Sequence, residues 1–148
     1  MGGDVFPPEK RSEVMSAIRS AGTKPERRLY EAVRAFLGER WRIDLNRTDL
    51  PGKPDLVIPT LRVAIFADGC FFHHCPIHGR IPTSRREYWE PKIHRNVERD
   101  RMAEAQLREA GFEVWRFWEH ELKTVSALAE TTNRIHRNLS RLMAARRG

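Results

Sequence analysis

The segment that most constrains the fold is the apolar run from Leu61 to Ala67, LRVAIFA. A short, nearly continuous apolar run of this kind is typical of a strand buried on both faces. Another short apolar run, Asp55 to Ile58, precedes it, and Pro59-Thr60 forms a turn signal between the two. The two runs therefore predict a β-hairpin.

Helical patterns lie on both sides of this hairpin. Thr23 to Glu26 reads as a capping box, and the helix that it starts ends at Gly38. Four further elements are predicted: strands over Trp41–Leu45 and Phe112–Trp118, and helices over Pro91–Ala110 and about 124–144. The strand–helix–strand unit over residues 61–118 predicts a right-handed parallel crossover. Joined to the hairpin, it predicts an α/β fold with a mixed β-sheet flanked by helices.

The length of 148 residues suits one domain. We expect residues 1–11, with two prolines, to form a flexible N-terminal arm, and residues 12–148 to form a single domain that begins with a short helix over 12–20. The chain has neither a run of 18 apolar residues nor an apolar secretion signal, so we expect no membrane partner and a cytoplasmic location. Two cysteines exclude a disulfide framework.

The charge of the chain indicates a polyanionic partner. Lys plus Arg number 27 against 20 acids, a net charge of +7, and 22 of the 27 are arginines. Arginine grips phosphate through a bidentate fork. No acid follows Glu130, whereas five arginines do, so the last helix is Arg-rich. A GC-rich genome explains the preference for arginine over lysine but not the excess of +7, which favours nucleic acid.

The densest chemistry lies between residues 69 and 79. Cys70, Cys75 and His78 have the spacing C-x₄-C-x₂-H, and a structural zinc site needs four such ligands. Three histidines compete for the fourth position: His73, His74 and His120. His120 follows the strand that ends at Trp118, and parallel pairing would return it to Cys70, which favours His120. Two free buried cysteines with surface histidines are the alternative, but five Cys or His within nine residues favour zinc.

Carboxylates form a second pattern. Asp55 follows Pro54 at the start of one hairpin strand and Asp68 ends the other, so both lie near the same end of the sheet. This is the skeleton of the Mg²⁺-dependent PD-(D/E)xK nucleases, although Cys70 stands where they have lysine. A Pro-Asp pair that only makes a turn is the simpler alternative.

Two further groups of polar residues have simple alternatives as well. Lys92, Asn96 and Asp100 recur at four-residue steps on one face of a helix, which also suits a solvated face. Glu26 serves the capping box, and a cap glutamate can also face a metal-bound water.

Five segments carry a more specific resemblance: Leu50–Asp55 (LPGKPD), Asp68–His73 (DGCFFH), Tyr88–Ile93 (YWEPKI), Asn96–Arg101 (NVERDR) and Val114–His120 (VWRFWEH). With Arg11 to Ile18, they resemble the very short patch repair (Vsr) endonucleases over roughly residues 11–122. That family nicks one strand of duplex DNA 5′ to the thymine of a T:G mismatch, which arises when 5-methylcytosine deaminates. The resemblance implies a restriction-endonuclease-like fold of the PD-(D/E)xK type.

The resemblance also implies catalytic roles. Asp55 would be the central Mg²⁺ ligand, and Ala67, where the family usually has Thr, would offer its backbone carbonyl. His73 would be the general base. Asp100 would orient His73 or support the metal-water network, and Glu26 would hold metal-bound water. Asp68 stands where the family has a His that helps at the phosphate, and it is instead a candidate second metal ligand, as in ordinary PD-(D/E)xK nucleases. The structural zinc would be held by Cys70, Cys75, His78 and His120.

The remaining implied roles concern DNA. Phe71, Phe72 and Trp89 would wedge between base pairs beside the mismatch, with Phe72 in place of a family Trp. The other implied contacts are Lys92 and Asn96 near the mismatched bases, and Met15 and Ile18 in the minor groove. The resemblance further implies a prokaryotic, nucleoid-associated monomer that acts on duplex DNA and is linked to a cytosine-5 DNA methyltransferase and to a repair polymerase and ligase.

Two other functions are alternatives to a mismatch endonuclease. One is a nuclease of the same fold without mismatch preference, and another is a non-catalytic, zinc-containing DNA-binding module. A pure binder has no need for Asp55, His73 and Asp100 near one site. A zinc deaminase is disfavoured, because the chain has neither H-x-E nor P-C-x-x-C.

Overall fold

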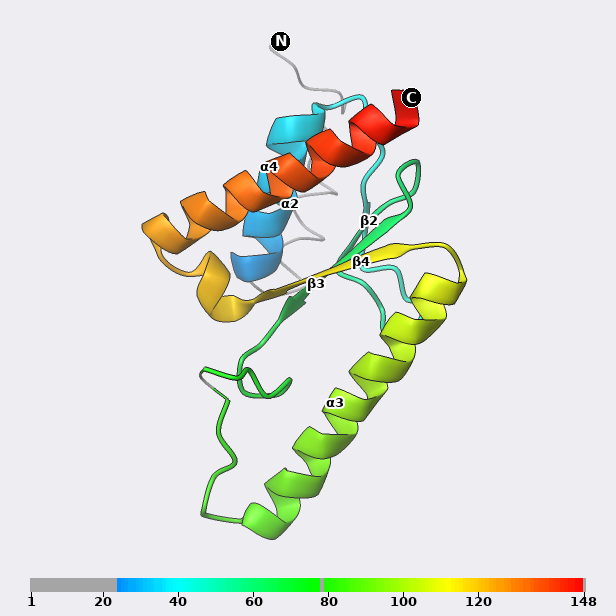
Figure 1. The fold of residues 1–148 in the computed structure, drawn as a ribbon. Coiled ribbons are helices and arrows are strands. Elements are labelled where there is room, and N and C mark those ends of the chain that lie inside the picture. Colours follow the sequence, from blue (N-terminus) through cyan, green and yellow to red (C-terminus); the bar gives the residue numbers. More distant parts are fainter. Residues whose placement is uncertain (1–23, 78, 148) are drawn as a thin grey trace, which may run out of the picture.

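The computed structural model describes residues 24–77 and 79–147 (Figure 1). The expected arm, the helix over 12–20, Met15, Ile18 and His78 lie outside the described residues. The described elements are, in chain order, α2 (Lys24–Leu37), β1 (Asp44–Leu45), β2 (Leu56–Ile58), β3 (Val63–Asp68), α3 (Arg86–Glu109), β4 (Glu113–Trp118), the 3₁₀-helix η1 (Glu119–Leu122) and α4 (Val125–Arg147).

The four strands form one mixed sheet in the order β1-β2-β3-β4. β2 and β3 pair antiparallel, which confirms the hairpin, and β3 pairs parallel with β4, which confirms the parallel connection through α3. The register sets Asp68, the last residue of β3, opposite Trp118, the last residue of β4. Five of the six β3 residues are buried, as the apolar run predicts.

Helices cover both faces of the sheet, with α2 and α4 on one side and α3 on the other (Figure 1). Alternate residues of β3 divide between the two layers, because successive side chains of a strand point to opposite faces. Val63 and Ile65 pack in the cluster with α2 and α4, whereas Ala64 and Phe66 pack with Leu107 of α3. The fold is therefore an α/β arrangement with three layers.

Two predicted boundaries are wrong. α3 starts at Arg86, one turn before Pro91, which lies inside the helix. Proline favours the first helical position, so the sequence pattern placed the start there. The earlier turn forms because the amides of Tyr88 and Trp89 both bond to the carbonyl of Arg85. The strand expected over 41–45 shrinks to Asp44–Leu45, where β1 meets β2.

The loop before β2 lies tightly against α3. Gly52 has φ +75°, and a Cβ there would lie 2.8 Å from the Cβ of Ala103 and 3.2 Å from the Phe66 ring. Glycine thus allows the close approach that delivers Asp55 to the end of the sheet. Among the described residues, none of the helices has the length and apolar character needed to cross a membrane.

Candidate active site

Asp55 lies where α2, β2 and β3 meet. Its backbone N–H donates to the carbonyl of Ile65 at 3.0 Å, and its Oδ2 accepts the N–H of Ala67 at 2.7 Å. Glu26, in the first turn of α2, shares a hydrogen bond with the Asp55 carboxyl. Burial raises the pKa of Asp55 to about 6, the Ala67 N–H opposes this, and the nearby Asp68 charge adds to it. Two carboxyl groups and a strand backbone therefore meet at one point.

His73 and Asp100 form a close pair beside this point. His73 comes from the loop after β3 and Asp100 from α3, and His73 Nδ1 lies 2.5 Å from Asp100 Oδ2. This hydrogen bond raises the pKa of His73, and burial opposes the rise. A carboxylate only accepts hydrogen bonds, so in the neutral ring Nδ1 carries the shared proton and Nε2 is the acceptor. The pair has the arrangement of an oriented general base.

Asp68 completes a group of three acid and histidine side chains. One ligand atom each of Asp68, His73 and Asp100 lies within 4.8 Å of the others. Asp68 is only 4% exposed, and burial raises its pKa although Arg116 opposes the rise. Arg116 Nη1 donates to both carboxylate oxygens, at 3.1 and 2.9 Å. Arg116 is a functional residue that the motifs did not reveal, although a charged residue inside the apolar strand EVWRFW was a signal for a buried partner.

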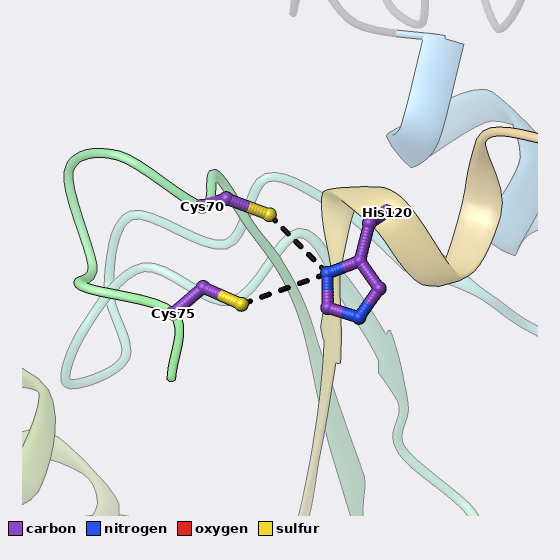
Figure 2. A group of neighbouring side chains, drawn as sticks. All are labelled: Cys70, Cys75 and His120. Carbon is purple, nitrogen blue, oxygen red and sulfur yellow. Dashed lines mark hydrogen bonds between the residues drawn. The ribbon is translucent and has the colours of Figure 1, made fainter. Parts of the chain in front are cut away.

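The structure brings Cys70, Cys75 and His120 together (Figure 2). His120 Nδ1 lies 3.4 Å from the sulfur of Cys70 and 3.6 Å from that of Cys75. Zinc bonds of about 2.3 Å to sulfur and about 2.0 Å to nitrogen would place such atoms about 3.5 Å apart in a tetrahedron. The three side chains thus fit a tetrahedral metal ion. His74, a competing histidine, is exposed on a backbone with φ +56°.

Aromatic rings gather beside the cysteine loop. Phe71 contacts Phe72 and Trp89 with ring centroids 5.0 and 5.3 Å apart, and Phe72 is 48% exposed. Tyr88 has no predicted role but joins the group, because its ring centroid lies 5.0 Å from that of Trp89. It is also exposed. The three aromatic residues singled out in the sequence therefore form one surface cluster.

Lys92 and Asn96 lie on the same side of α3 as these rings. The ammonium of Lys92 is 5.6 Å from the centroids of both Tyr88 and Trp89. The amide of Asn96 donates to the carbonyl of Phe72 at 3.2 Å, so it ties the aromatic loop to α3.

Two cavities meet at the His73–Asp100 pair. One, of about 580 Å³, runs along α3 and is also lined by Lys53, Phe72 and Asn96. The other, of about 500 Å³, includes Asp68 and Arg116. The His73–Asp100 pair is thus reached from the face that carries the exposed aromatic ring of Phe72.

Comparison with known proteins shows the family to which this chain belongs. The model of the family described as DNA mismatch endonuclease Vsr matches residues 3–78, a range that contains Asp55, Cys70 and His73. The type II nicking enzyme V.NaeI of Lentzea aerocolonigenes is 47% identical over 85% of this chain and 76% of its own length. The chain belongs to the Vsr family of DNA mismatch endonucleases.

Other Vsr-like relatives agree. The type II nicking enzyme V.XorIIP of Xanthomonas oryzae is 43% identical, over 84% of this chain and 90% of its own length. The DNA mismatch endonuclease Vsr of Escherichia coli is 38% identical, over 81% of this chain and 76% of its own length. Membership of the Vsr family thus rests on relatives that span most of the chain.

The raised pKa of Asp55 predicts how stability depends on pH. The free carboxyl ionises at 3.8 but the folded one only at about 6. The folded state therefore holds this proton more tightly, and the stabilisation present below pH 3.8 is lost as the pH rises through about 6. In buffer without divalent cations, Asp55→Asn should exceed the wild-type free energy of unfolding by up to about 3 kcal/mol above about pH 7.

Urea unfolding at acid and neutral pH measures this difference. Asp49→Asn is the matched control, because Asp49 is exposed and pairs with Arg47, which lowers its pKa to about 2. The control should show no such gain. A wild-type protein as stable as Asp55→Asn at neutral pH would contradict the prediction.

Proposed function

We propose that this chain is a Mg²⁺-dependent endonuclease that nicks one strand of duplex DNA at T:G mismatches, on a restriction-endonuclease-like fold. The observation that carries the proposal is the convergence of Asp55 and the His73–Asp100 pair at one end of the sheet, beside an exposed aromatic cluster. Membership of the Vsr family supports the same reading. A pure DNA-binding module has no use for an oriented histidine beside a group of carboxylates.

The residues around Asp55 suit a hard divalent cation. Asp55, the Ala67 backbone carbonyl and, through water, Glu26 are the proposed ligands, since Mg²⁺ takes few carboxylates and retains water. Burial of Asp55 and the nearby negative charge of Asp68 raise the pKa of Asp55, so a bound cation would relieve this cost. When bound, Mg²⁺ would offset the negative charge that develops around the scissile phosphate.

His73 and Asp100 supply the proton transfer. His73 Nε2 accepts a proton from the attacking water, and the Asp100 carboxylate stabilises the imidazolium that results. The short contact between His73 and Asp100 holds the ring in the tautomer that leaves Nε2 free of hydrogen. Asp100 is therefore proposed to orient His73 rather than to contact DNA.

Duplex DNA containing a T:G mismatch is the proposed partner. Phe71, Phe72 and Trp89 would enter the gap beside the weakly stacked wobble pair, with Lys92 and Asn96 near the bases. Met15 and Ile18 are proposed to contact the minor groove. We further propose that the chain acts as a monomer, after a cytosine-5 DNA methyltransferase has created the target and before a polymerase and a ligase complete repair.

Zinc is the metal that we propose for the cysteine cluster. The distances from the His120 nitrogen to the two sulfurs match those around a tetrahedral zinc ion, and soft thiolates favour zinc over Mg²⁺. His78 is the proposed fourth ligand. The site would fix the loop that carries Phe71, Phe72 and His73, since all three lie between Cys70 and Cys75 in the chain.

The nicking prediction tests the reaction itself. Asp55→Ala should abolish nicking of a T:G duplex and leave DNA binding largely intact, because it removes the metal ligand but no phosphate contact. His73→Ala should slow single-turnover nicking by roughly 10²–10⁴-fold, the usual contribution of a general base. His74→Ala, the neighbouring exposed histidine, is the control and should keep its activity. Equal nicking of T:G and T:A duplexes would instead support a nuclease without mismatch preference.

The zinc prediction concerns metal content. Purified wild-type protein should carry about one zinc per chain, and Cys70→Ser or His120→Ala should lose zinc and melt at a lower temperature, because structural zinc supplies folding free energy. His74→Ala should retain its zinc. Elemental analysis and thermal melting measure both effects, and folded wild-type protein free of zinc would refute the assignment.

The wedge prediction separates recognition from packing. Phe72→Ala and Trp89→Ala should lower T:G over T:A discrimination at least roughly tenfold, since a stacked aromatic contributes about 1–3 kcal/mol. Phe72 is half exposed, so its loss should barely change the melting temperature. Phe36→Ala, another part-exposed phenylalanine on α2, should leave discrimination unchanged. Retained discrimination with a large loss of stability would make the rings core residues.

A further inference from the structure

We propose that Arg116 is a positioning residue that holds Asp68 and the His73–Asp100 pair in fixed positions relative to one another. We call this arrangement of Arg116 and Asp68 the clamp, and in it Asp68 is not a metal ligand. The inference rests on the proposed nicking activity. It assigns a role to an arginine that neither the motifs nor the charge pattern singled out.

The guanidinium of Arg116 joins three elements. From β4, its Nη1 donates to both oxygens of Asp68 at the end of β3. Its Nε donates to Glu104 of α3 at 3.0 Å, and its Nη2 lies 3.4 Å from the backbone carbonyl of Asp100. Its flat face lies 4.1 Å from the Phe66 ring centroid, and the side chain is 21% exposed. Hydrogen bonds along its edges and the ring against one face hold this rigid planar group in one position.

These contacts occupy Asp68. Both of its oxygens already accept hydrogens from a cation, and the carboxylate is 4% exposed. A divalent ion at Asp68 would have to sit beside the guanidinium charge or displace it, and either arrangement is unfavourable in a buried site. Among residues 24–77 and 79–147, the groups that hydrogen-bond to the Asp55 carboxyl are the Ala67 N–H and the Glu26 side chain, and neither is an arginine.

Arg116 also protects the His73–Asp100 pair. A carboxylate oxygen of Asp68 lies within 4.8 Å of ligand atoms of both His73 and Asp100. Without Arg116, the unpaired Asp68 becomes a second acceptor for the His73 ring and competes with Asp100. The backbone of Asp100 loses its contact to Nη2 in the same step. Misplacement of His73 by about 1 Å is enough to slow the reaction about 10²-fold.

A double-mutant cycle tests the clamp. Arg116→Gln should slow single-turnover nicking roughly 10²-fold, with little change in the Kd for the duplex, because the lesion lies in positioning. Adding Asp68→Asn removes the competing carboxylate, so the double variant should regain at least about tenfold over Arg116→Gln alone. If Asp68 is a metal ligand, the double variant will be no more active than Arg116→Gln, and that result overturns the proposal.

Arg108→Gln is the matched control. Arg108 also pairs with Glu104 and lines the same cavity, but it is exposed, and the hydrogen bonds to Asp68 come from Arg116 instead. It should stay within about twofold of the wild-type rate, as surface ion pairs contribute little. A slowing equal to that of Arg116→Gln would show that cavity charge, and not the clamp, matters.

Two readouts do not depend on nicking. In the ¹⁵N NMR spectrum of the His73 ring, Arg116→Gln should shift the Nδ1 signal, and the double variant should restore it. Calorimetric Mn²⁺ binding should survive Asp68→Asn and disappear in Asp55→Asn, and loss of binding in Asp68→Asn overturns the proposal. A wild-type protein that nicks no DNA would refute the proposed function, while the NMR and Mn²⁺ measurements still decide the clamp.

Discussion

The pairing of β3 with a neighbour on each side is the constraint on which the site depends. Its antiparallel partner begins just after Asp55, and its parallel partner ends at Trp118, so three chain segments reach the same end of the sheet. Because β3 is buried on both faces, its register cannot slip without moving a whole apolar face into solvent. The relative positions of Asp55, Asp68 and His120 are therefore set by backbone hydrogen bonds and core packing, and not by the mobility of loops.

Placing several carboxyl groups together at one end of a sheet is unfavourable, because their negative charges repel. The fold lowers this cost differently at Asp68 and at Asp55. Asp68 is neutralised within the protein, by an arginine that is itself held by α3 and the Phe66 ring. Asp55 has the Ala67 N–H and the Glu26 carboxyl as neighbours, and burial keeps its pKa near 6. Within the part of the chain that the structure describes, no arginine or lysine pairs with the Asp55 carboxyl, so an external cation can balance its charge. This difference separates the proposed metal ligand from the proposed clamp, although both residues are aspartates at adjoining strand ends.

One short loop carries residues proposed for both DNA recognition and catalysis. The Cys75 N–H bonds to the Cys70 carbonyl at 2.9 Å, and the Gly79 N–H bonds to the Cys75 carbonyl at 2.7 Å. A Cβ at Gly79 would lie 2.6 Å from the Cys75 backbone, so the loop closes on itself as tightly as a side-chain-free residue allows. In the proposed mechanism this loop holds the wedge rings and His73 in one rigid unit. Insertion of these rings beside a mismatch would then bring the general base His73 to the DNA strand with no separate rearrangement.

The sequence by itself determined the apolar central strand, the hairpin, the parallel connection and the meeting of Cys70 with Cys75, because these depend on local patterns and short spacings. It also suggested His120, since a parallel return after the crossover restricts where that residue can lie. It placed the start of α3 one turn late, because local preference puts proline first in a helix. Only the tertiary structure decided that Arg116 neutralises Asp68, 48 residues away, and that Tyr88 joins the aromatic cluster. The physical reason is that partners across a sheet are chosen by strand register and by which face each side chain takes, and both are fixed only when the whole core packs.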